Sequence, residues 1–412
     1  MQVSSSANSR PSRRVLVVLV VAGSARLCDA RAAPSQAAAL WQLYEIADGP
    51  RWEQKQNWNP TGDPCSFDYR WVGVGCTDPC HWSDGTDCLL GKVTALTLDY
   101  NRLNGNLTDW DKLGALTNLT VIDLSGNSLR GALPTELGEV QTLLRFDAPL
   151  NQLGGFLPTE LGAINMQFAV TDLLQFNLRD NSISGTVPSQ LGVHTRIELI
   201  ELRENSLSGT IPLQLVANHT KLLALHAHDN PRLSGTLPTE LGDATSLRFV
   251  NFARCALSGT LPPSLGGMPE LYALDMESNN LTGTIPDELT DLRVLRTLRL
   301  ANNHLEGNLP ERIGNMARLE VLDVYNNSMD GDVPASIRDL TELKELYLAH
   351  EHLLPIRRKY CGQRFPDIGK YSWVIIRAEY DQMMNAYCPD DQLLSTRWTW
   401  GKLQDLLPHD EL

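Results

Sequence analysis

Apolar residues recur along most of this chain with a period of about 24 residues. One unit runs Leu-x-x-Leu-x-Leu-x-x-Asn-x-Leu-x-Gly-x-Leu-Pro from Leu295 to Pro310, and the next begins at Leu319. The alternation of leucine and polar residues at the start of each unit predicts a short strand whose leucines point inward. One unit cannot bury its own apolar face, so we expect the units to stack into a solenoid with a parallel sheet.

The alignment of the units on their first apolar residue indicates about eleven repeats over residues 93–353. Most steps are 24 or 25 residues, but one step is 30. We expect the additional residues, around 163–171, to bulge from the convex or lateral side, and a one-residue insertion falls at Pro231. The first apolar residues are Val93, Leu119, Leu143, Leu173, Ile197, Leu222, Leu247, Leu271, Leu295, Leu319 and Leu343.

One position after each strand usually holds asparagine. Its buried amide must bond backbone groups of its own coil and of the adjacent coil, which predicts a hydrogen-bonded ladder along the solenoid. Cys255 occupies this position in the seventh unit, where we interpret it as a buried, unreactive substitute for asparagine. Glu351 occupies it in the eleventh unit and marks the end of the ladder. The asparagines are Asn101, Asn127, Asn151, Asn181, Asn205, Asn230, Asn279, Asn303 and Asn327.

The repeat motif and the N-terminal block resemble a known family. The segment Leu257 to Pro262 followed by Leu265-Gly266 resembles the plant-type leucine-rich repeat. The block from Trp41 to Cys76, with its Asp-Pro-Cys and Trp-Val-Gly-Val motifs, is similar to the N-terminal cap of receptor-kinase ectodomains and polygalacturonase-inhibiting proteins. The resemblance implies an α/β fold, a right-handed superhelix with a concave parallel sheet and a second short strand near each Gly-x-Leu/Ile-Pro.

Caps are expected at both ends of the solenoid, because each end would otherwise expose the core. For residues 34–92 we expect a helix capped by Ser35, and the resemblance implies a Cys65–Cys76 disulfide. Cys80 and Cys88 would then close a small loop. A zinc site in this segment has the wrong spacing for the common Cys-x-x-Cys pairs. For residues 354–388 we expect a second cap closed by Cys361 and Cys388.

Both ends of the chain carry features of the secretory pathway. Two arginines precede a short apolar run within residues 1–33, which indicates a cleaved signal peptide rather than a membrane span. Residues 389–412 have no repeat periodicity, and we expect a flexible tail. They end in the retrieval tetrapeptide His-Asp-Glu-Leu, which predicts recognition by the retrieval receptor of the endoplasmic reticulum. Its residues are His409, Asp410, Glu411 and Leu412.

Composition narrows the classes of function. The formal net charge is −14, and the chain after the first 33 residues carries about −18, which disfavours nucleic acid and anionic membranes as partners. No catalytic motif is present, no cofactor is expected, and carboxylates are not paired in a recognisable acid–base arrangement. We therefore predict a non-enzymatic protein. Cys255 is the sole candidate for a thiol-based redox role.

The outward-facing strand positions are the candidate binding site. Between the two inner leucines the predicted column runs Thr97, Asp123, Asp147, Asn177, Glu201, His226, Asn251, Asp275, Arg299, Asp323, Tyr347. Repeats four to seven place basic and acidic residues together on this concave face. One interpretation is a recognition patch that binds a carboxylate or polar segment through arginine; the other is a row of mutually satisfied, exposed ion pairs. The residues are Arg179, Asp180, Glu201, Arg203, Glu204, His226, His228, Asp229 and Arg254. The two histidines lack an evident third ligand for a metal.

Five sequons suit a glycoprotein of the secretory pathway, at Asn106, Asn118, Asn218, Asn280 and Asn326. Asn326 belongs to the outward concave set, so a glycan there would direct binding toward the middle repeats. We predict a module of the endoplasmic reticulum lumen that binds a protein or glycan on its concave face. The alternatives are a secreted recognition or inhibitor protein similar to polygalacturonase inhibitors, and a redox helper that uses Cys255.

Overall fold

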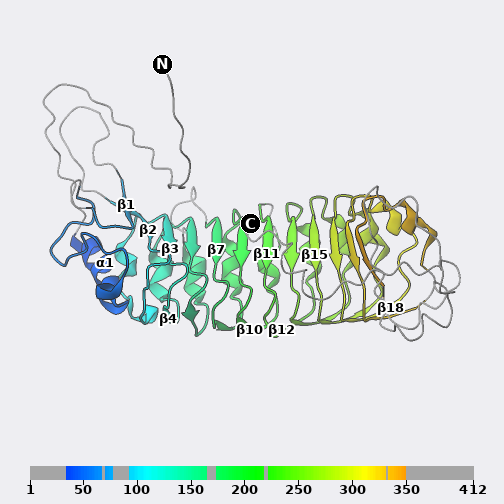
Figure 1. The fold of residues 1–412 in the computed structure, drawn as a ribbon, viewed down its shortest axis with the longest axis horizontal. Helices are drawn as coiled ribbons and strands as arrows, with labels where there is room; N and C mark the ends of the chain where they lie inside the picture. The colour runs from blue at the N-terminus through cyan, green and yellow to red at the C-terminus, as the bar shows by residue number, and fades with distance from the viewer. Residues whose placement is uncertain are drawn as a thin grey trace, which may run out of the picture.

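A computed structural model describes residues 34–66, 70–77, 92–164, 173–217, 221–330 and 333–348. The described chain forms one elongated solenoid in which successive coils stack side by side, from the blue N-terminal helix to the orange last repeats (Figure 1). Several predictions lie outside the described residues: the signal peptide, the Cys80–Cys88 loop, most of the 163–171 insertion, Asn218, Glu351, the Cys361–Cys388 cap and the tail with its retrieval signal.

The N-terminal cap combines one helix with an aromatic cluster. Helix α1 (Pro34–Ile46) buries Leu40 and Leu43 against the first coil. Trp41 and Tyr44 of the helix pack with Trp52, Trp58 and Trp71 from the segment that follows, and the Trp58 and Trp71 rings lie 4.6 Å apart. The helix starts at or before Pro34, so Ser35 lies inside it and the predicted capping role of Ser35 is wrong; proline is well suited to the first turn because it lacks an N–H that would need a partner.

The predicted disulfide between Cys65 and Cys76 is present, with the two Cα atoms 5.8 Å apart. It ties the aromatic cluster to strand β1 (Val74–Cys76), which pairs antiparallel with strand β2 (Val93–Thr97) of the first repeat. The Trp110 indole N–H also donates to the carbonyl of Ala39 in α1 at 2.9 Å. The disulfide therefore fastens the cap internally, and a strand pairing and a buried hydrogen bond join the cap to the repeats.

The long sheet contains twelve strands, of which β1 is antiparallel and the following eleven are parallel. The eleven parallel strands correspond to the eleven predicted repeats. They are β2, β3 (Val121–Asp123), β5 (Arg145–Asp147), β7 (Gln175–Asn177), β9 (Leu199–Glu201), β11 (Ala224–His226), β13 (Phe249–Asn251), β15 (Ala273–Asp275), β17 (Thr297–Arg299), β19 (Val321–Asp323) and β21 (Glu345–Tyr347).

Short strands near each Gly-x-Leu/Ile-Pro form a seven-stranded and a two-stranded sheet. The second strand implied by the resemblance is therefore present. Its glycines have positive φ, and an added Cβ at Gly235 would meet the Thr210 methyl at 2.6 Å, so the site needs glycine. The strands are β4 (Arg130–Gly131), β6 (Gln152–Leu153), β8 (Ser184–Gly185), β10 (Ser206–Gly209), β12 (Arg232–Gly235), β14 (Ala256–Gly259), β16 (Asn280–Gly283), β18 (His304–Gly307) and β20 (Ser328–Met329).

Short 3-10 helices complete the coils, most of them directly after the repeat proline. Each one after the first places a leucine or isoleucine in the core. They are η1 (Gly49–Arg51), η2 (Leu107–Asp109), η3 (Leu113–Ala115), η4 (Thr135–Glu139), η5 (Thr159–Ala163), η6 (Ser189–Val193), η7 (Leu213–Leu215), η8 (Thr239–Asp243), η9 (Pro263–Gly267), η10 (Asp287–Asp291), η11 (Ile313–Asn315) and η12 (Ala335–Asp339). No helix among the described residues has the length and apolar character that a bilayer span requires.

The asparagine ladder forms as the pattern predicts. Asn205 donates through Nδ2 to the carbonyls of Leu178 at 2.9 Å and Leu202 at 3.1 Å, and its Oδ1 accepts from the Ile183 N–H at 2.9 Å. From Asn127 onward each amide satisfies backbone groups of its own coil and the preceding one, whereas Asn101 bonds to the backbone of Gln54 in the cap. Because these groups are buried, the ladder fixes the spacing between coils.

Cys255 substitutes for asparagine only in part. Its thiol donates to the Ala227 carbonyl at 3.4 Å, but sulfur is a weak acceptor. The Leu233 N–H, whose equivalents in other coils donate to the next asparagine, instead donates to the Asn230 carbonyl at 2.9 Å. The turn made possible by the Pro231 insertion therefore provides the acceptor that Cys255 lacks.

Candidate binding face

The side of the long sheet that faces away from the core is here called the concave face. Strand register aligns Glu201, His226 and Asn251 as direct neighbours on β9, β11 and β13. The same pairing continues through Asp275 and Arg299 on the next two strands. The column predicted between the inner leucines is therefore confirmed along the whole sheet, since every described pairing follows it.

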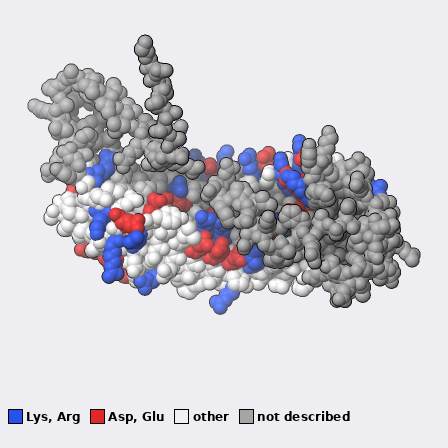
Figure 2. Space-filling model, viewed as in Figure 1, with Lys and Arg blue, Asp and Glu red and all other residues white. Residues whose placement is uncertain are grey.

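The nine predicted patch residues come together on four successive coils. We call them the mid-solenoid patch. In Figure 2, acidic and basic side chains lie side by side over the middle of the solenoid, in the region where Figure 1 labels β7 and β11. Every member of the patch comes either from a strand of the long sheet or from the turn that directly follows it.

Glu201 lies at the centre of the patch and is only 8% exposed. Its Oε1 is hydrogen-bonded to Nδ1 of His226 at 2.5 Å, and its Oε2 lies 3.6 Å from Nε of Arg203. The first contact is a strong hydrogen bond, whereas the second is longer than a hydrogen bond should be. Glu201 is thus bonded on one oxygen and left open on the other.

Arg254 and Asp229 form a two-point ion pair on the next coils. Nε and Nη2 of Arg254 reach the two carboxylate oxygens of Asp229 at 2.6 and 2.7 Å. This hydrogen bonding lowers the pKa of Asp229 and raises that of Arg254. Each member of the pair satisfies the other. This agrees with the second interpretation of the sequence, a row of mutually satisfied ion pairs, for this part of the patch.

His228 is buried beside this pair and is held neutral. Burial, followed by the charge of nearby Arg203, lowers the pKa of His228 to about 4. Its Nε2 lies 4.0 Å from the Asp229 carboxylate, too far for a hydrogen bond. At neutral pH the ring is therefore an uncharged group that carries one N–H donor and one acceptor nitrogen.

Four buried side-chain atoms of the patch have no hydrogen-bond partner within the described residues: Arg179 Nε, Glu201 Oε2, Arg203 Nε and His228 Nδ1. Unsatisfied buried polar atoms are costly and rare in folded proteins. Their concentration on three adjacent coils distinguishes this region from the self-satisfied Asp229–Arg254 pair. The patch therefore offers two cationic donors and two further polar atoms to an incoming group.

Two carboxyl groups share a hydrogen bond at the edge of the patch. Asp180 follows β7 and Glu204 follows β9, both with positive φ. The hydrogen bond that the protonated Glu204 carboxyl donates to Asp180, together with burial, raises the pKa of Glu204. Nε of Arg179 lies 3.9 Å from Asp180 Oδ2, so Arg179 is held near this acidic pair without bonding to it.

The sequence interpretation did not single out a second cluster on the later repeats. Asp275 and Asp323 flank Arg299, whose Nη1 lies 3.8 Å from Asp275 Oδ2. Burial raises the pKa of Asp275, and it raises that of Asp323 to about 6. The column of outward strand positions could have indicated this cluster, because Arg299 stands there between Asp275 and Asp323. Asn326, at the edge of this region, is exposed and donates to Asn302 Oδ1 at 2.9 Å.

Cys255, the candidate for thiol chemistry, is partly buried. Burial raises the pKa of the Cys255 thiol to about 11, which suppresses the reactive thiolate at neutral pH. Among the described residues, no group of three or more histidine, cysteine, aspartate or glutamate side chains is arranged to hold a metal ion.

These features define a leucine-rich-repeat solenoid that resembles the plant type. The sequence matches the Leucine Rich Repeat family over residues 118–140, 246–268, 270–292 and 294–316. It is 39% identical over 64 residues to an inactive leucine-rich-repeat receptor-like serine/threonine-protein kinase of Arabidopsis thaliana, a match that covers 16% of this chain and 10% of the relative.

Solved structures extend the likeness to receptor ectodomains. The plant peptide hormone receptor RGFR1 in complex with RGF2 is 30% identical with a TM-score of 0.50, over 58% of this chain and 41% of the receptor. The Arabidopsis receptor kinase HAESA ectodomain, in complex with an IDA peptide hormone, is also 30% identical with a TM-score of 0.51, over 61% and 45% of the chains. This chain thus spans less than half of either receptor chain.

A plant ice-binding protein has a TM-score of 0.58 at 20% identity, over 74% of this chain and 90% of that protein, and shows the fold alone. The family match and the receptor structures together show a leucine-rich-repeat solenoid similar to plant receptor ectodomains.

Proposed function

We propose that the mid-solenoid patch binds a partner protein or glycan by receiving a carboxylate between Arg179 and Arg203. The observation that carries the proposal is the set of four buried polar atoms without a partner, two of which are guanidinium donors on adjacent coils. A bound carboxylate would satisfy both donors through charge-assisted hydrogen bonds. The relatives with bound peptides support the use of this type of fold for ligand recognition.

Peptide selection tests this proposal. A random peptide library displayed on phage would be selected on the wild-type protein and on the Arg179→Glu, Arg203→Glu variant. We expect wild-type selection to enrich aspartate and glutamate, and the enriched peptides to bind the variant at least tenfold more weakly. The matched control reverses two exposed arginines outside the long sheet, Arg293 and Arg318, and changes the net charge equally. Equal binding to the variant and the wild type would refute the proposal.

We further infer that the protein acts in the lumen of the endoplasmic reticulum. The likeness to receptor ectodomains supports the secretory pathway. Retention there rests on His409–Leu412, which lie outside the described residues. Deletion of these four residues should increase secretion into the medium, because the retrieval receptor would no longer bind the chain. Unchanged secretion would contradict retrieval and favour a secreted recognition protein.

Glycosylation is a further part of this proposal. Asn106, Asn280 and Asn326 are exposed at the surface and Asn118 is partly exposed. A glycan on Asn326 would stand at the edge of the concave face beside Asn302. We expect it to obstruct the later repeats and leave the mid-solenoid patch open. Peptide mass mapping of the purified glycoprotein checks whether Asn326 carries the glycan.

A further inference from the structure

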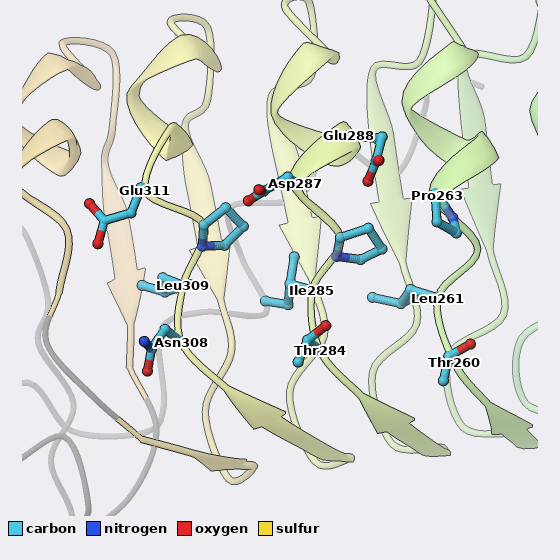
Figure 3. A pocket seen from close by; sticks show the side chains of 12 residues that line it. Thr260, Leu261, Pro263, Thr284, Ile285, Asp287, Glu288, Asn308, Leu309 and Glu311 are labelled. Carbon is cyan, nitrogen blue, oxygen red and sulfur yellow. The ribbon is translucent and has the colours of Figure 1, made fainter.

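Two open grooves lie on the lateral face of the solenoid, between the strands of the second sheet and the 3-10 helices. One extends over repeats three to five, with a volume of about 870 Å³, and is here called the neutral groove. Its counterpart over repeats seven to nine has about 630 Å³ and is called the acidic groove. Figure 3 shows the acidic groove, with Asp287, Glu288 and Glu311 near its rim.

The two grooves differ in charge although they occupy equivalent positions of the repeat. None of the residues that line the neutral groove is charged. Gln190 and Gln214 occupy the position that is glutamate in several other repeats, namely Glu136, Glu160, Glu240 and Glu288. In a chain of net charge −14, an uncharged groove of this size selects against charged ligands, since it offers no counter-charge.

An exposed aromatic ring borders the neutral groove. Phe156 is 69% exposed and occupies the position at which the next repeats have Thr186 and Thr210. The ring lies directly against the backbone of Gly185, because an added Cβ there would come within 2.3 Å of Phe156 Cδ1. Gly185 has φ +76°, so the site excludes a side chain on two grounds. One side of the Phe156 ring therefore contacts the backbone of Gly185, and most of the ring is exposed to solvent.

The polar groups of the neutral groove are also available to a ligand. The hydroxyls of Thr186 and Thr210 and the amide of Gln214 make no hydrogen bond within the described chain. Hydroxyl and amide groups both donate and accept. They suit a ligand that presents many hydroxyls of its own.

We propose that the neutral groove binds a neutral hexopyranose unit of a glycan, with the sugar's C–H face stacked on Phe156. A pyranose ring has one apolar face of C–H groups and a rim of hydroxyls. The apolar face matches the exposed phenyl ring, and the hydroxyls match Thr186, Thr210 and Gln214. This site is separate from the mid-solenoid patch and does not depend on it.

The test titrates the full-length protein with cellohexaose, with a linear mannohexaose and with hexagalacturonate, by calorimetry. We expect saturable binding of at least one neutral hexasaccharide and weaker binding of hexagalacturonate. Phe156→Ala should weaken the neutral sugar about tenfold, since a stacking platform is lost. The matched control is Thr284→Ala in the acidic groove, and Arg179→Glu with Arg203→Glu should also leave sugar affinity unchanged.

A second variant leaves Phe156 in place, so that a folding defect of Phe156→Ala does not decide the result. Gln190→Glu with Gln214→Glu installs the acid that other repeats carry at this position, so the fold accepts it. Loss of the amide donors should again reduce affinity for the neutral sugar. The proposal is overturned if neither neutral hexasaccharide binds, if the groove variants bind as the wild type does, or if hexagalacturonate binds more tightly.

Discussion

Replacement of Asn230 by alanine should destabilise the solenoid far more than the same change at Cys255. Both residues occupy the ladder position, in adjacent coils. Asn230 is fully buried; its Nδ2 donates to the carbonyls of Ala227 at 2.9 Å and Leu202 at 3.0 Å, and its Oδ1 accepts from the Leu207 N–H at 2.9 Å. Asn230→Ala leaves the Leu207 N–H buried without a partner and removes one donor from each carbonyl. Asn205 Nδ2 still donates to the Leu202 carbonyl and the Cys255 thiol to the Ala227 carbonyl.

The magnitude follows from that count. The orphaned Leu207 N–H costs about 1–3 kcal/mol and each hydrogen bond lost from a carbonyl about 0.5–1.5 kcal/mol, so Asn230→Ala should lower the free energy of unfolding by about 3 kcal/mol. Cys255→Ala removes one thiol contact at 3.4 Å and should cost about 1 kcal/mol or less. The Leu233 N–H is already satisfied by the Asn230 carbonyl and loses nothing.

Urea denaturation monitored by circular dichroism measures both variants against the wild type. We expect Asn230→Ala to lower the free energy of unfolding by at least about 1.5 kcal/mol more than Cys255→Ala does. This margin exceeds the value of a single buried hydrogen bond, which is about 1 kcal/mol. Equal losses in the two variants would refute the reasoning that the amide ladder, rather than side-chain volume, holds the coils together.

Three further outcomes are expected. Iodoacetamide should label Cys255 at least about tenfold more slowly in the folded protein than in urea at pH 8, because burial raises the thiol pKa to about 11; rapid labelling would revive a redox role. His228 has a folded pKa of about 4 against an ordinary value of 6.5, so the unfolded chain binds more protons between these values and stability should fall as pH drops through this window. The wild type should lose up to about 3 kcal/mol of its free energy of unfolding across this window, and His228→Gln should not show this loss. Urea denaturation at several pH values measures it, and the same pH dependence in both proteins would contradict the prediction. Cys65→Ser with Cys76→Ser removes the disulfide between two residues 11 positions apart and should lower the free energy of unfolding by about 2–4 kcal/mol. The measurement is the urea midpoint, which should lie below that of the oxidised wild type.

Much of the architecture could be predicted from the sequence, because the sequence contains two periodic patterns, the repeat of about 24 residues and the 2-residue alternation within each strand. The 2-residue alternation determines which strand residues face outward, and the column containing Glu201, His226 and Asn251 follows from it. The asparagine position identifies the ladder, because a buried amide has few other solutions. The Cys65–Cys76 pairing came from the resemblance of the cap.

The interactions within the patch could not be predicted from the sequence, because they depend on side-chain directions. The sequence placed Arg203, Glu201 and Asp229 on one face but left two interpretations open. The structure shows that the two arginine environments differ within the patch: Arg254 and Asp229 satisfy each other, whereas the Nε atoms of Arg179 and Arg203 lie near carboxylates without a hydrogen bond. Burial effects such as the raised pKa of Asp323 likewise depend on how neighbouring coils exclude water.

The central claim is that Arg179 and Arg203 receive a partner's carboxylate. A double-mutant cycle tests it most directly, using a peptide selected on the wild-type protein, with its key aspartate or glutamate changed to the amide, and the Arg179→Ala, Arg203→Ala variant. Titration calorimetry on the four combinations should give a coupling free energy of about 1.5–3 kcal/mol, as expected of hydrogen bonds to charged groups. A coupling near zero, with the two changes simply additive, would contradict the account.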